Sequence, residues 1–278
     1  MAAWDYSSKN GQHKWGVHCK IGTRQSPIDI VHKDTTFDDQ LNINPLDVNQ
    51  EVGCSFTVLN KGVNISFSPK EVNGEAKISG GPLASIYRFK ECHFHWGRNA
   101  TPGSEHLING DRSEAELHLV HFKEEEENPL ESGNGLSVLG IRLVVSDQTN
   151  PELKKLLKLF KDANFKGDQK ESGDVIKIYQ ILSDIRGKFY TYDGSLTTPP
   201  LAECVKWIVF SEPVTISRED FDISFAAVYA VNRGEESNEY YDPFTRSDCC
   251  TCGEKPKIGD NYRDICDLNG RKVTRSFK

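Results

Sequence analysis

Two histidines stand two residues apart in a segment that alternates between large apolar and polar residues. His93 and His95 lie in ECHFHWG, and a third histidine, His118, lies in ELHLVH. Side chains at alternate positions of a β-strand point to the same face of a sheet. The spacing therefore predicts that His93 and His95 converge on one point, with Phe94 turned away. We expect a neighbouring strand of the same sheet to add His118.

Three imidazoles held in this way form a ligand set for zinc. Catalytic zinc sites use three protein ligands and keep the fourth tetrahedral position open, and a metal at such a site makes water a nucleophile at neutral pH. A His-x-His pair alone is weak support, because most histidine pairs are packed in cores or lie on surfaces without a metal. The strand pattern, the third histidine and nearby acidic residues favour a zinc (Zn2+) site here.

Acidic residues stand where partners of these histidines are expected. Glu116 shares a strand face with His118, and Glu91 bears the same relation to His93. A zinc-bound imidazole usually donates its other N–H to a carboxylate or a carbonyl, so both glutamates are candidate partners. The alternative for Glu91 is contact with another cation. His121 points to the opposite face, and we interpret it as a packed core histidine.

Composition and charge restrict the class of protein. The chain has 278 residues, 37% hydrophobic and 27% charged, with a formal net charge of −7. These values predict a soluble globular protein and argue against nucleic acid as a main partner, since phosphate binding needs clustered Lys and Arg. No apolar run is long enough to predict a membrane span, and the N-terminus has no apolar region like that of a signal peptide. We expect a single domain over residues 1–278 in the cytoplasm, or a secreted protein if a leader has been removed.

Short runs of alternating apolar residues, broken by Gly, Pro, Asn and Asp, predict strands. These runs are FTVLN, VNISFS, YRFKECHFHWG, AELHLVHF, LSVLGIRLVV and CVKWIVF. A helix is predicted from Asn150 to Asp162, with Asn150 as N-cap and Pro151 at its first position, and another from Ser217 onward, with Asp220 three residues after the cap. The predicted fold class is mainly β (α+β), with short peripheral helices.

The zinc chemistry also needs an acceptor that orients a hydroxide. A threonine hydroxyl that donates to a buried carboxylate can only accept from the hydroxide. The segments SLTTPPL and GSEH offer these two groups. Residue spacing does not by itself pair Thr197 with Glu105.

The segments ECHFHWG, GSEH, AELHLVHF, SLTTPPLAECVKWIVF and RQSPIDI together resemble the α-class carbonic anhydrases, and most of all their cytoplasmic members. The resemblance runs from Trp4 to the final SFK. It implies a large twisted, mostly antiparallel mixed sheet with zinc at the bottom of a conical cavity. It also implies reversible hydration of carbon dioxide to bicarbonate and a proton, by attack of zinc-bound hydroxide.

The resemblance implies roles for individual residues. The zinc ligands are His93, His95 and His118. Thr197 orients the hydroxide and is held by Glu105, while Glu116 supports His118 and Glu91 accompanies His93. The remaining matched positions are Thr198 beside the substrate, Tyr6 in an ordered-water network, and an apolar wall for carbon dioxide formed by Val120, Val138, Leu196, Val205 and Trp207. Carbon dioxide and sulfonamide-type inhibitors are the implied ligands, and we expect a monomer.

The chain departs from the family at several positions. Fast members carry a histidine after the turn that here reads LNKGVNISF, and Val63, which cannot carry a proton, takes its place. We therefore predict that proton release limits turnover and that imidazole accelerates it. Lys61 and the acidic run KEEEEN are less favoured proton carriers. Glu91 stands where many members have glutamine, which predicts a higher pKa for zinc-bound water.

The sequence also allows two alternatives. A second zinc site is a minor alternative to free thiols at Cys249, Cys250, Cys252 and Cys266. The rival function is a non-catalytic binding protein of anhydrase-like fold. Such relatives usually lack a zinc histidine, whereas all three are present here.

Overall fold

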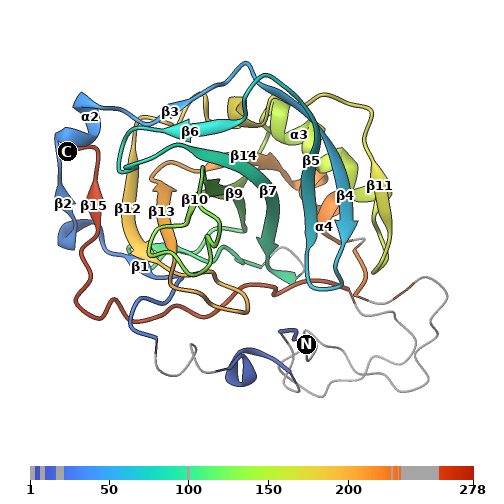
Figure 1. Cartoon of the computed structure of the whole chain (residues 1–278). Coiled ribbons are helices and arrows are strands. Elements are labelled where there is room, and N and C mark those ends of the chain that lie inside the picture. The colour runs from blue at the N-terminus through green and yellow to red at the C-terminus, as the bar shows by residue number, and fades with distance from the viewer. Residues whose placement is uncertain are drawn as a thin grey trace.

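The computed structural model describes residues 4–6, 10–16, 22–98, 101–226, 228–230, 232 and 257–278. Its dominant feature is a 13-stranded sheet with the main order β11-β4-β5-β7-β9-β10-β13-β12-β15-β2 (Figure 1). Most neighbouring strands are antiparallel, whereas β10 runs parallel to β13 and β14, and β15 runs parallel to β2. This mixed, mostly antiparallel sheet with few short helices confirms the predicted fold class.

The longest strands lie at the centre of the sheet. They are β7 (Tyr87–Trp96), β9 (Ala115–Lys123) and β10 (Leu136–Ser146). The others are β1 (Asp29–Ile30), β2 (Thr36–Phe37), β3 (Asp47–Val48), β4 (Gly53–Asn60), β5 (Ile65–Asn73), β6 (Lys77–Ser79), β8 (Leu107–Ile108), β11 (Gln169–Glu171), β12 (Phe189–Gly194), β13 (Val205–Phe210), β14 (Val214–Ser217) and β15 (Thr274–Arg275). All six predicted strands coincide with or overlap observed ones.

Both predicted helix starts are confirmed. The side chain of Asn150 accepts from the backbone N–H groups of Glu152 and Leu153, both at 3.1 Å, at the start of α3 (Pro151–Leu157). Ser217 Oγ accepts from the backbone N–H of Asp220 at 3.1 Å at the start of α4 (Arg218–Phe225). The remaining helices are α2 (Gln40–Ile43) and the 3-10 turns η1 (Gln12–Lys14), η2 (His32–Asp34), η4 (Lys158–Asp162) and η5 (Ile178–Leu182).

The helix predicted from Asn150 to Asp162 is wrong in its second half. After Leu157 the chain tightens into η4, in which Leu159 and Phe160 are buried. A 3-10 turn commonly ends an α-helix. Phe160 continues the apolar face of α3, whereas the burial of Leu159 adds a neighbouring position to the core.

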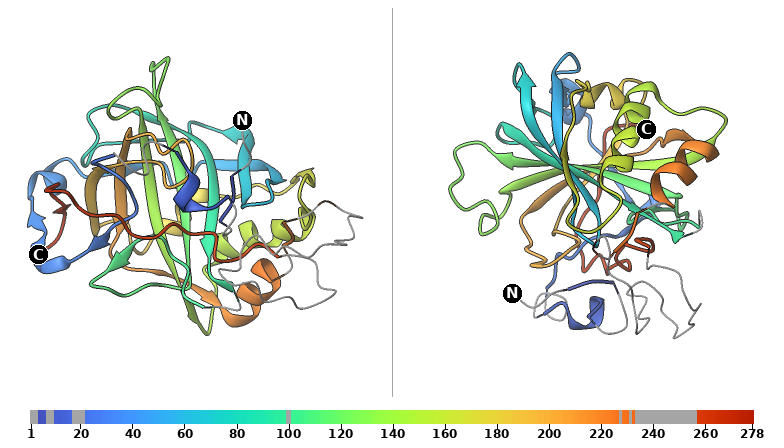
Figure 2. Two further views of the ribbon diagram at one scale, coloured as in Figure 1. Left: turned by 90° about the horizontal axis from the view of Figure 1, so that it is seen from below. Right: turned by 90° about the vertical axis from the view of Figure 1, so that its right-hand side faces the viewer.

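The two faces of the central sheet bury different apolar clusters. On one face, Phe94, Leu117 and Leu119 join the apolar side chains of α3, η4 and α4 in the larger cluster. The helices α3 and α4 lie together there (Figure 2). On the other face Val120 and Val138 belong to a second cluster. Because side chains alternate along a strand, the helices cover the face opposite to the three histidines.

The segment 257–273 near the C-terminus has no helix or strand and follows the lower edge of the sheet in Figure 1. It is held to β7 by Asn261, whose side-chain oxygen accepts from the backbone N–H of Trp96 at 2.8 Å. Within the described ranges, no helix is long and apolar enough to cross a membrane.

Candidate metal centre

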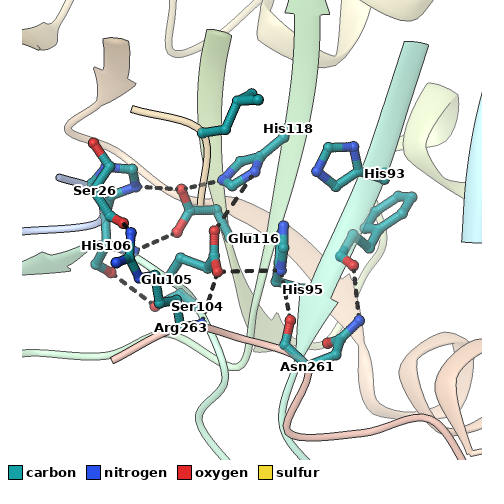
Figure 3. A network of polar contacts seen from close by, with 12 residues as sticks. Ser26, His93, His95, Ser104, Glu105, His106, Glu116, His118, Asn261 and Arg263 are labelled. Atoms are coloured by element: carbon teal, nitrogen blue, oxygen red, sulfur yellow. Dashed lines mark hydrogen bonds and ion pairs between the residues drawn. The ribbon is translucent and has the colours of Figure 1, made fainter. Parts of the chain in front are cut away.

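Three histidine rings from two neighbouring strands converge on one point (Figure 3). His93 and His95 lie on β7, and the antiparallel register places His93 opposite His118 of β9. The ring centroids of His93 and His95 are 5.1 Å apart, and those of His95 and His118 are 4.7 Å apart. One nitrogen from each ring lies within 4.8 Å of the other two. The structure thus brings together the three residues that strand periodicity had grouped.

Hydrogen bonds on the outer side of the rings fix which nitrogens face the centre. His95 Nδ1 lies 2.7 Å from the backbone oxygen of Asn261 and donates to it. His118 Nε2 lies 2.9 Å from Glu116 Oε1 and donates to this carboxylate. His95 Nε2 and His118 Nδ1 therefore carry lone pairs that are available to a metal ion.

The nitrogen His95 Nε2 provides the test of whether a metal fits. It is buried and has no hydrogen-bond partner among the described residues. An unpaired buried polar atom costs about 1–3 kcal/mol, and a metal bonded to this atom removes that cost. Three imidazole nitrogens are also the protein ligands of catalytic zinc. The residues present therefore fit a zinc ion.

The protonation of the rings also suits metal binding. Burial lowers the pKa of His93, and burial together with the charges of His118 and His93 lowers the pKa of His95 well below its usual value. Both imidazoles are consequently neutral at neutral pH. A histidine must be neutral to bind a metal.

Glu91 contacts both of the partners considered for it. Its Oε1 atom lies 3.4 Å from His93 Nδ1, and its Oε2 atom lies 3.2 Å from Lys61 Nζ. His93 Nδ1 makes no hydrogen bond of normal geometry among the described residues. Glu91 therefore forms an ion pair with Lys61 at the side of the His93 ring, rather than a tight partnership with His93 alone.

Glu116 is the most highly connected carboxylate of the centre. Besides His118, it accepts from both the ring and the backbone of His106: Oε1 lies 2.7 Å from His106 Nδ1, and Oε2 lies 2.7 Å from the backbone N–H of His106. Burial alone would raise the pKa of Glu116, but His106 and His118 outweigh it and hold this pKa well below the usual value. Glu116 is thus an ionised acceptor that orients two rings.

The structure also places Glu105 beside Thr197. Glu105 is fully buried and its Oε1 atom accepts from the backbone N–H of Arg263 at 2.8 Å. Burial raises the pKa of Glu105 to about 7, against lowering influences that include His118 and the Thr197 hydroxyl. Glu105 Oε2 has no hydrogen-bond partner within the described ranges and is available to accept the Thr197 proton. This proximity is the pairing that sequence spacing did not supply.

The five residues matched to an apolar wall lie together next to His118. Val138 of β10 is in register with Val120 of β9 on one side and with Trp207 of β13 on the other. These three residues and Val205 are buried in one cluster, and Leu196 packs against it. The Trp207 ring centroid lies 4.9 Å from that of His118. An apolar surface therefore adjoins the histidine set.

The other sequence-derived positions are also located. Tyr6 packs against Trp15 with ring centroids 5.1 Å apart, and burial, together with the charge of Glu105, raises the pKa of Tyr6. The backbone oxygen of Thr198 accepts from the backbone N–H of Leu201 in the loop that carries Thr197. The backbone oxygen of Val63 accepts from Asn261 Nδ2 at 3.1 Å, so the turn without a histidine is tied to the same network.

Sequence reasoning missed three residues of this centre: Asn261, Arg263 and His106. His106 belongs to the GSEH motif, so its position beside Glu105 is a signal that could have been used. Asn261 and Arg263 lie in DNYRD, 166 residues beyond His95 and 158 beyond Glu105, respectively. That segment has no hydrophobic periodicity from which a contact with β7 could be predicted.

Among the described residues, no cysteine joins the three histidines as a candidate ligand. Cys54, Cys92 and Cys204 are buried free thiols, and Cys266 is partly exposed. The cysteines at 249, 250 and 252, which carry the alternative second zinc site, lie outside the described residues.

Comparison with known proteins gives matches over nearly the whole chain. A model of the eukaryotic-type carbonic anhydrase family matches residues 10–277. Carbonic anhydrase 7 of Mus musculus is 32% identical, with 99% of this chain and 97% of the relative covered. Carbonic anhydrase 7 of Homo sapiens is 31% identical over the same shares of the two chains.

Proposed function

Because the chain belongs to the eukaryotic-type carbonic anhydrase family, whose enzymes are lyases acting on carbon dioxide, we propose that it is a zinc enzyme whose metal is held by His93, His95 and His118. The observation that carries this proposal is the buried, unpaired His95 Nε2, which points into the histidine set. A zinc ion bound at such a site lowers the pKa of its water to about 7 and supplies a nucleophile at neutral pH.

Glu105 and Thr197 orient the nucleophile. Arg263 fixes Glu105 through a backbone N–H at 2.8 Å, and the free Oε2 atom accepts the Thr197 proton. A positive charge nearby lowers a carboxylate pKa, so a dication opposes the rise caused by burial and favours the ionised acceptor. The Thr197 oxygen, having donated its only hydrogen, can only accept from the group that attacks carbon dioxide.

The apolar wall receives carbon dioxide. Val120, Val138 and Trp207 form a contiguous buried surface across three strands, and an uncharged, apolar molecule is favoured at such a surface over water. The Trp207 ring next to His118 places this surface at the attacking side. Leu196, Val205 and Thr198 complete the substrate site in this proposal.

Proton release is the step that distinguishes this chain. Val63 stands in the turn between β4 and β5 where fast relatives have a histidine, and its side chain cannot accept a proton. Lys61, two residues earlier, is paired with Glu91. The acidic run is also partly engaged, because Glu124 pairs with Arg88 and Glu126 lies 3.9 Å from Lys123. We infer that proton release to buffer limits turnover.

The proposal also covers the number of domains, the oligomeric state, the inhibitors and the location of the protein. The 13-stranded sheet draws its strands from Thr36 to Arg275, which supports a single domain over the chain. A monomer, sensitivity to sulfonamides and a cytoplasmic location stay predictions. The presence of all three histidines, Glu105 and Thr197 favours an active enzyme over a non-catalytic binding protein.

The test replaces one histidine of β9 and uses another as its control. His118→Ala should lower stopped-flow carbon dioxide hydration by more than about 100-fold and remove bound zinc, because a metal ligand is lost. His121→Gln, three residues along the same strand, alters the opposite core and should leave zinc content and rate unchanged. Near-ultraviolet circular dichroism reports whether each variant is folded. A folded His118→Ala protein with normal hydration would contradict the proposal.

A further inference from the structure

A cavity lies where β15 separates from β12. Its volume is about 290 Å³. The two strands pair only at Tyr190–Arg275 and Thr191–Thr274, and they stand side by side in Figure 1. The residues that line it are Arg24, Thr191, Tyr192, Asp193, Lys206, Arg271, Lys272 and Thr274. None of these residues is one of the three histidines or of the five wall residues, although Tyr192 contacts the surroundings of both: its Oη atom lies 2.7 Å from His106 Nε2, and its ring stacks on Trp207.

The cavity carries an excess of positive charge in an acidic protein. Four of its lining residues are Lys or Arg and one is acidic, whereas the chain as a whole has a net charge of −7. Lys206 pairs with Asp193, which leaves three cations without a carboxylate inside the cavity. Arg24 is bound to Glu203 outside the cavity: its Nη2 atom donates to the backbone oxygen of Glu203 at 2.9 Å, and its Nε atom lies 3.9 Å from Glu203 Oε2. Lys272 has no ion pair within the described part of the chain.

Arg271 is held in place by neutral groups. Its guanidinium donates to the backbone oxygens of Leu268, Asp193, Gln25 and Asp267 at 2.9, 3.1, 2.7 and 2.8 Å, respectively. A guanidinium has five N–H donors, so these four bonds leave one donor over. The backbone thus orients the group without neutralising its charge.

The hydroxyl of Thr191 is the second, independent feature of the cavity. Thr191 is 6% exposed, and its Oγ1 atom is buried without a hydrogen-bond partner among the described residues. A buried hydroxyl without a partner is unfavourable by an amount that a ligand oxygen can recover. A solvated basic surface would not explain a buried, unpaired hydroxyl on one of the residues that line it.

We propose that this cavity binds a small oxyanion of the phosphate class, either free phosphate or the phosphate group of a small monoester. Thr191 and the remaining Arg271 donor bind its oxygens, and the lysine and arginine charges around them balance its two negative charges. Arg and Lys are the residues that recognise phosphate oxygens in proteins. The volume lies at the small end of ligand cavities, which favours a small anion over an extended ligand.

The test is isothermal titration of the zinc-loaded full chain with inorganic phosphate at low ionic strength, repeated with glycerol 3-phosphate as a monoester. We expect saturable binding with a dissociation constant of about 1 mM or below, weakened by added sodium chloride. Tighter binding of the monoester would identify an ester as the ligand, and equal binding would identify the phosphate group alone. A chelator-treated sample should still bind, because no residue that lines the cavity is a proposed metal ligand.

Three variants make the result specific. Thr191→Val should weaken binding by about tenfold, the loss expected for one hydrogen bond to an anion. Asp193→Asn should strengthen binding, because it releases the charge of Lys206, and a gain cannot arise from misfolding. Asp174→Asn, at an exposed aspartate outside the cavity, is the control for Asp193→Asn with the same loss of a negative charge and should not change affinity. No binding, binding that disappears with the metal, or affinities unaltered by the Thr191 and Asp193 variants would overturn the proposal.

Discussion

Replacing Glu116 by glutamine tests how the centre is preorganised. The carboxylate accepts three N–H groups: His106 Nδ1 at 2.7 Å, His118 Nε2 at 2.9 Å and the backbone N–H of His106 at 2.7 Å. Glu116→Gln keeps the size of the side chain but turns one acceptor into a donor. In either orientation of the amide, one N–H then faces another N–H in a site without exposure to water.

The expected magnitude follows from these contacts. If the amide nitrogen faces the rings, His118 either keeps its proton on Nε2 and loses the hydrogen bond to residue 116, or moves the proton to Nδ1. A proton on Nδ1 occupies the position of the metal. Loss of such an outer partner typically costs 10–100-fold in metal affinity, or about 1.4–2.7 kcal/mol. If the amide nitrogen instead faces the His106 backbone, the unpaired group destabilises the fold by about 1–3 kcal/mol. We expect both effects together, with weaker zinc binding as the larger.

The assay is a zinc competition titration against a chelator of known affinity, combined with urea unfolding of the metal-free protein. Glu114→Gln is the control, because it makes the same change of charge two residues away. Within the described residues, the Glu114 carboxylate accepts from the backbone N–H of Val145 alone, at 3.3 Å. Equal zinc affinity in wild type, Glu116→Gln and Glu114→Gln would refute the reasoning that hydrogen bonding to Glu116 sets the ligand geometry.

Three further predictions concern other parts of the structure. Burial lowers the pKa of His121 from 6.5 to about 3. As the pH falls, His121 therefore takes up a proton in the unfolded chain before it does so in the folded chain, and the free energy of unfolding should drop by about 2 kcal/mol between pH 7 and pH 5 from this group alone. Urea unfolding of chelator-treated protein should show a steeper pH dependence for wild type than for His121→Gln. Equal slopes would count against this prediction. Asn261→Ala should destabilise the protein by about 2–4 kcal/mol in urea unfolding, since it leaves the buried backbone N–H of Trp96 unpaired and removes the hydrogen bonds to the backbone oxygens of Val63 and Phe94. A loss below about 1 kcal/mol would be inconsistent with the proposed role of Asn261 in holding its segment to β7. Val63→His should raise turnover in stopped-flow assays at low buffer concentration by about tenfold or more, and should reduce the stimulation by imidazole, because it restores a proton carrier. A wild-type rate that imidazole does not change would contradict the proposal that proton release limits turnover.

Local patterns of sequence were sufficient for much of the centre. The two-residue period of a strand grouped His93 with His95 and separated both from Phe94, and the observed faces of β7 agree with this grouping. Cap chemistry located the starts of α3 and α4 at Asn150 and Ser217. These features depend on neighbours within a few residues, and their physical causes are present in the sequence itself.

Contacts between distant segments were not predictable in this way. The partner of His95 is the backbone oxygen of Asn261, 166 residues away, and any residue type has such an oxygen. The ion pair of Glu91 with Lys61 depends on how the turn before β5 meets β7. The change from α-helix to 3-10 turn after Leu157 depends on packing against the sheet. Tertiary packing decides each of these features, and the local sequence does not encode it visibly.

The most direct test of the central claim is the metal content of the purified protein, measured by mass spectrometry alongside carbon dioxide hydration. We predict one zinc ion per chain, loss of activity when a chelator removes it, and recovery of activity in proportion to the zinc that is returned. Full hydration activity in folded protein that contains no metal would contradict the account.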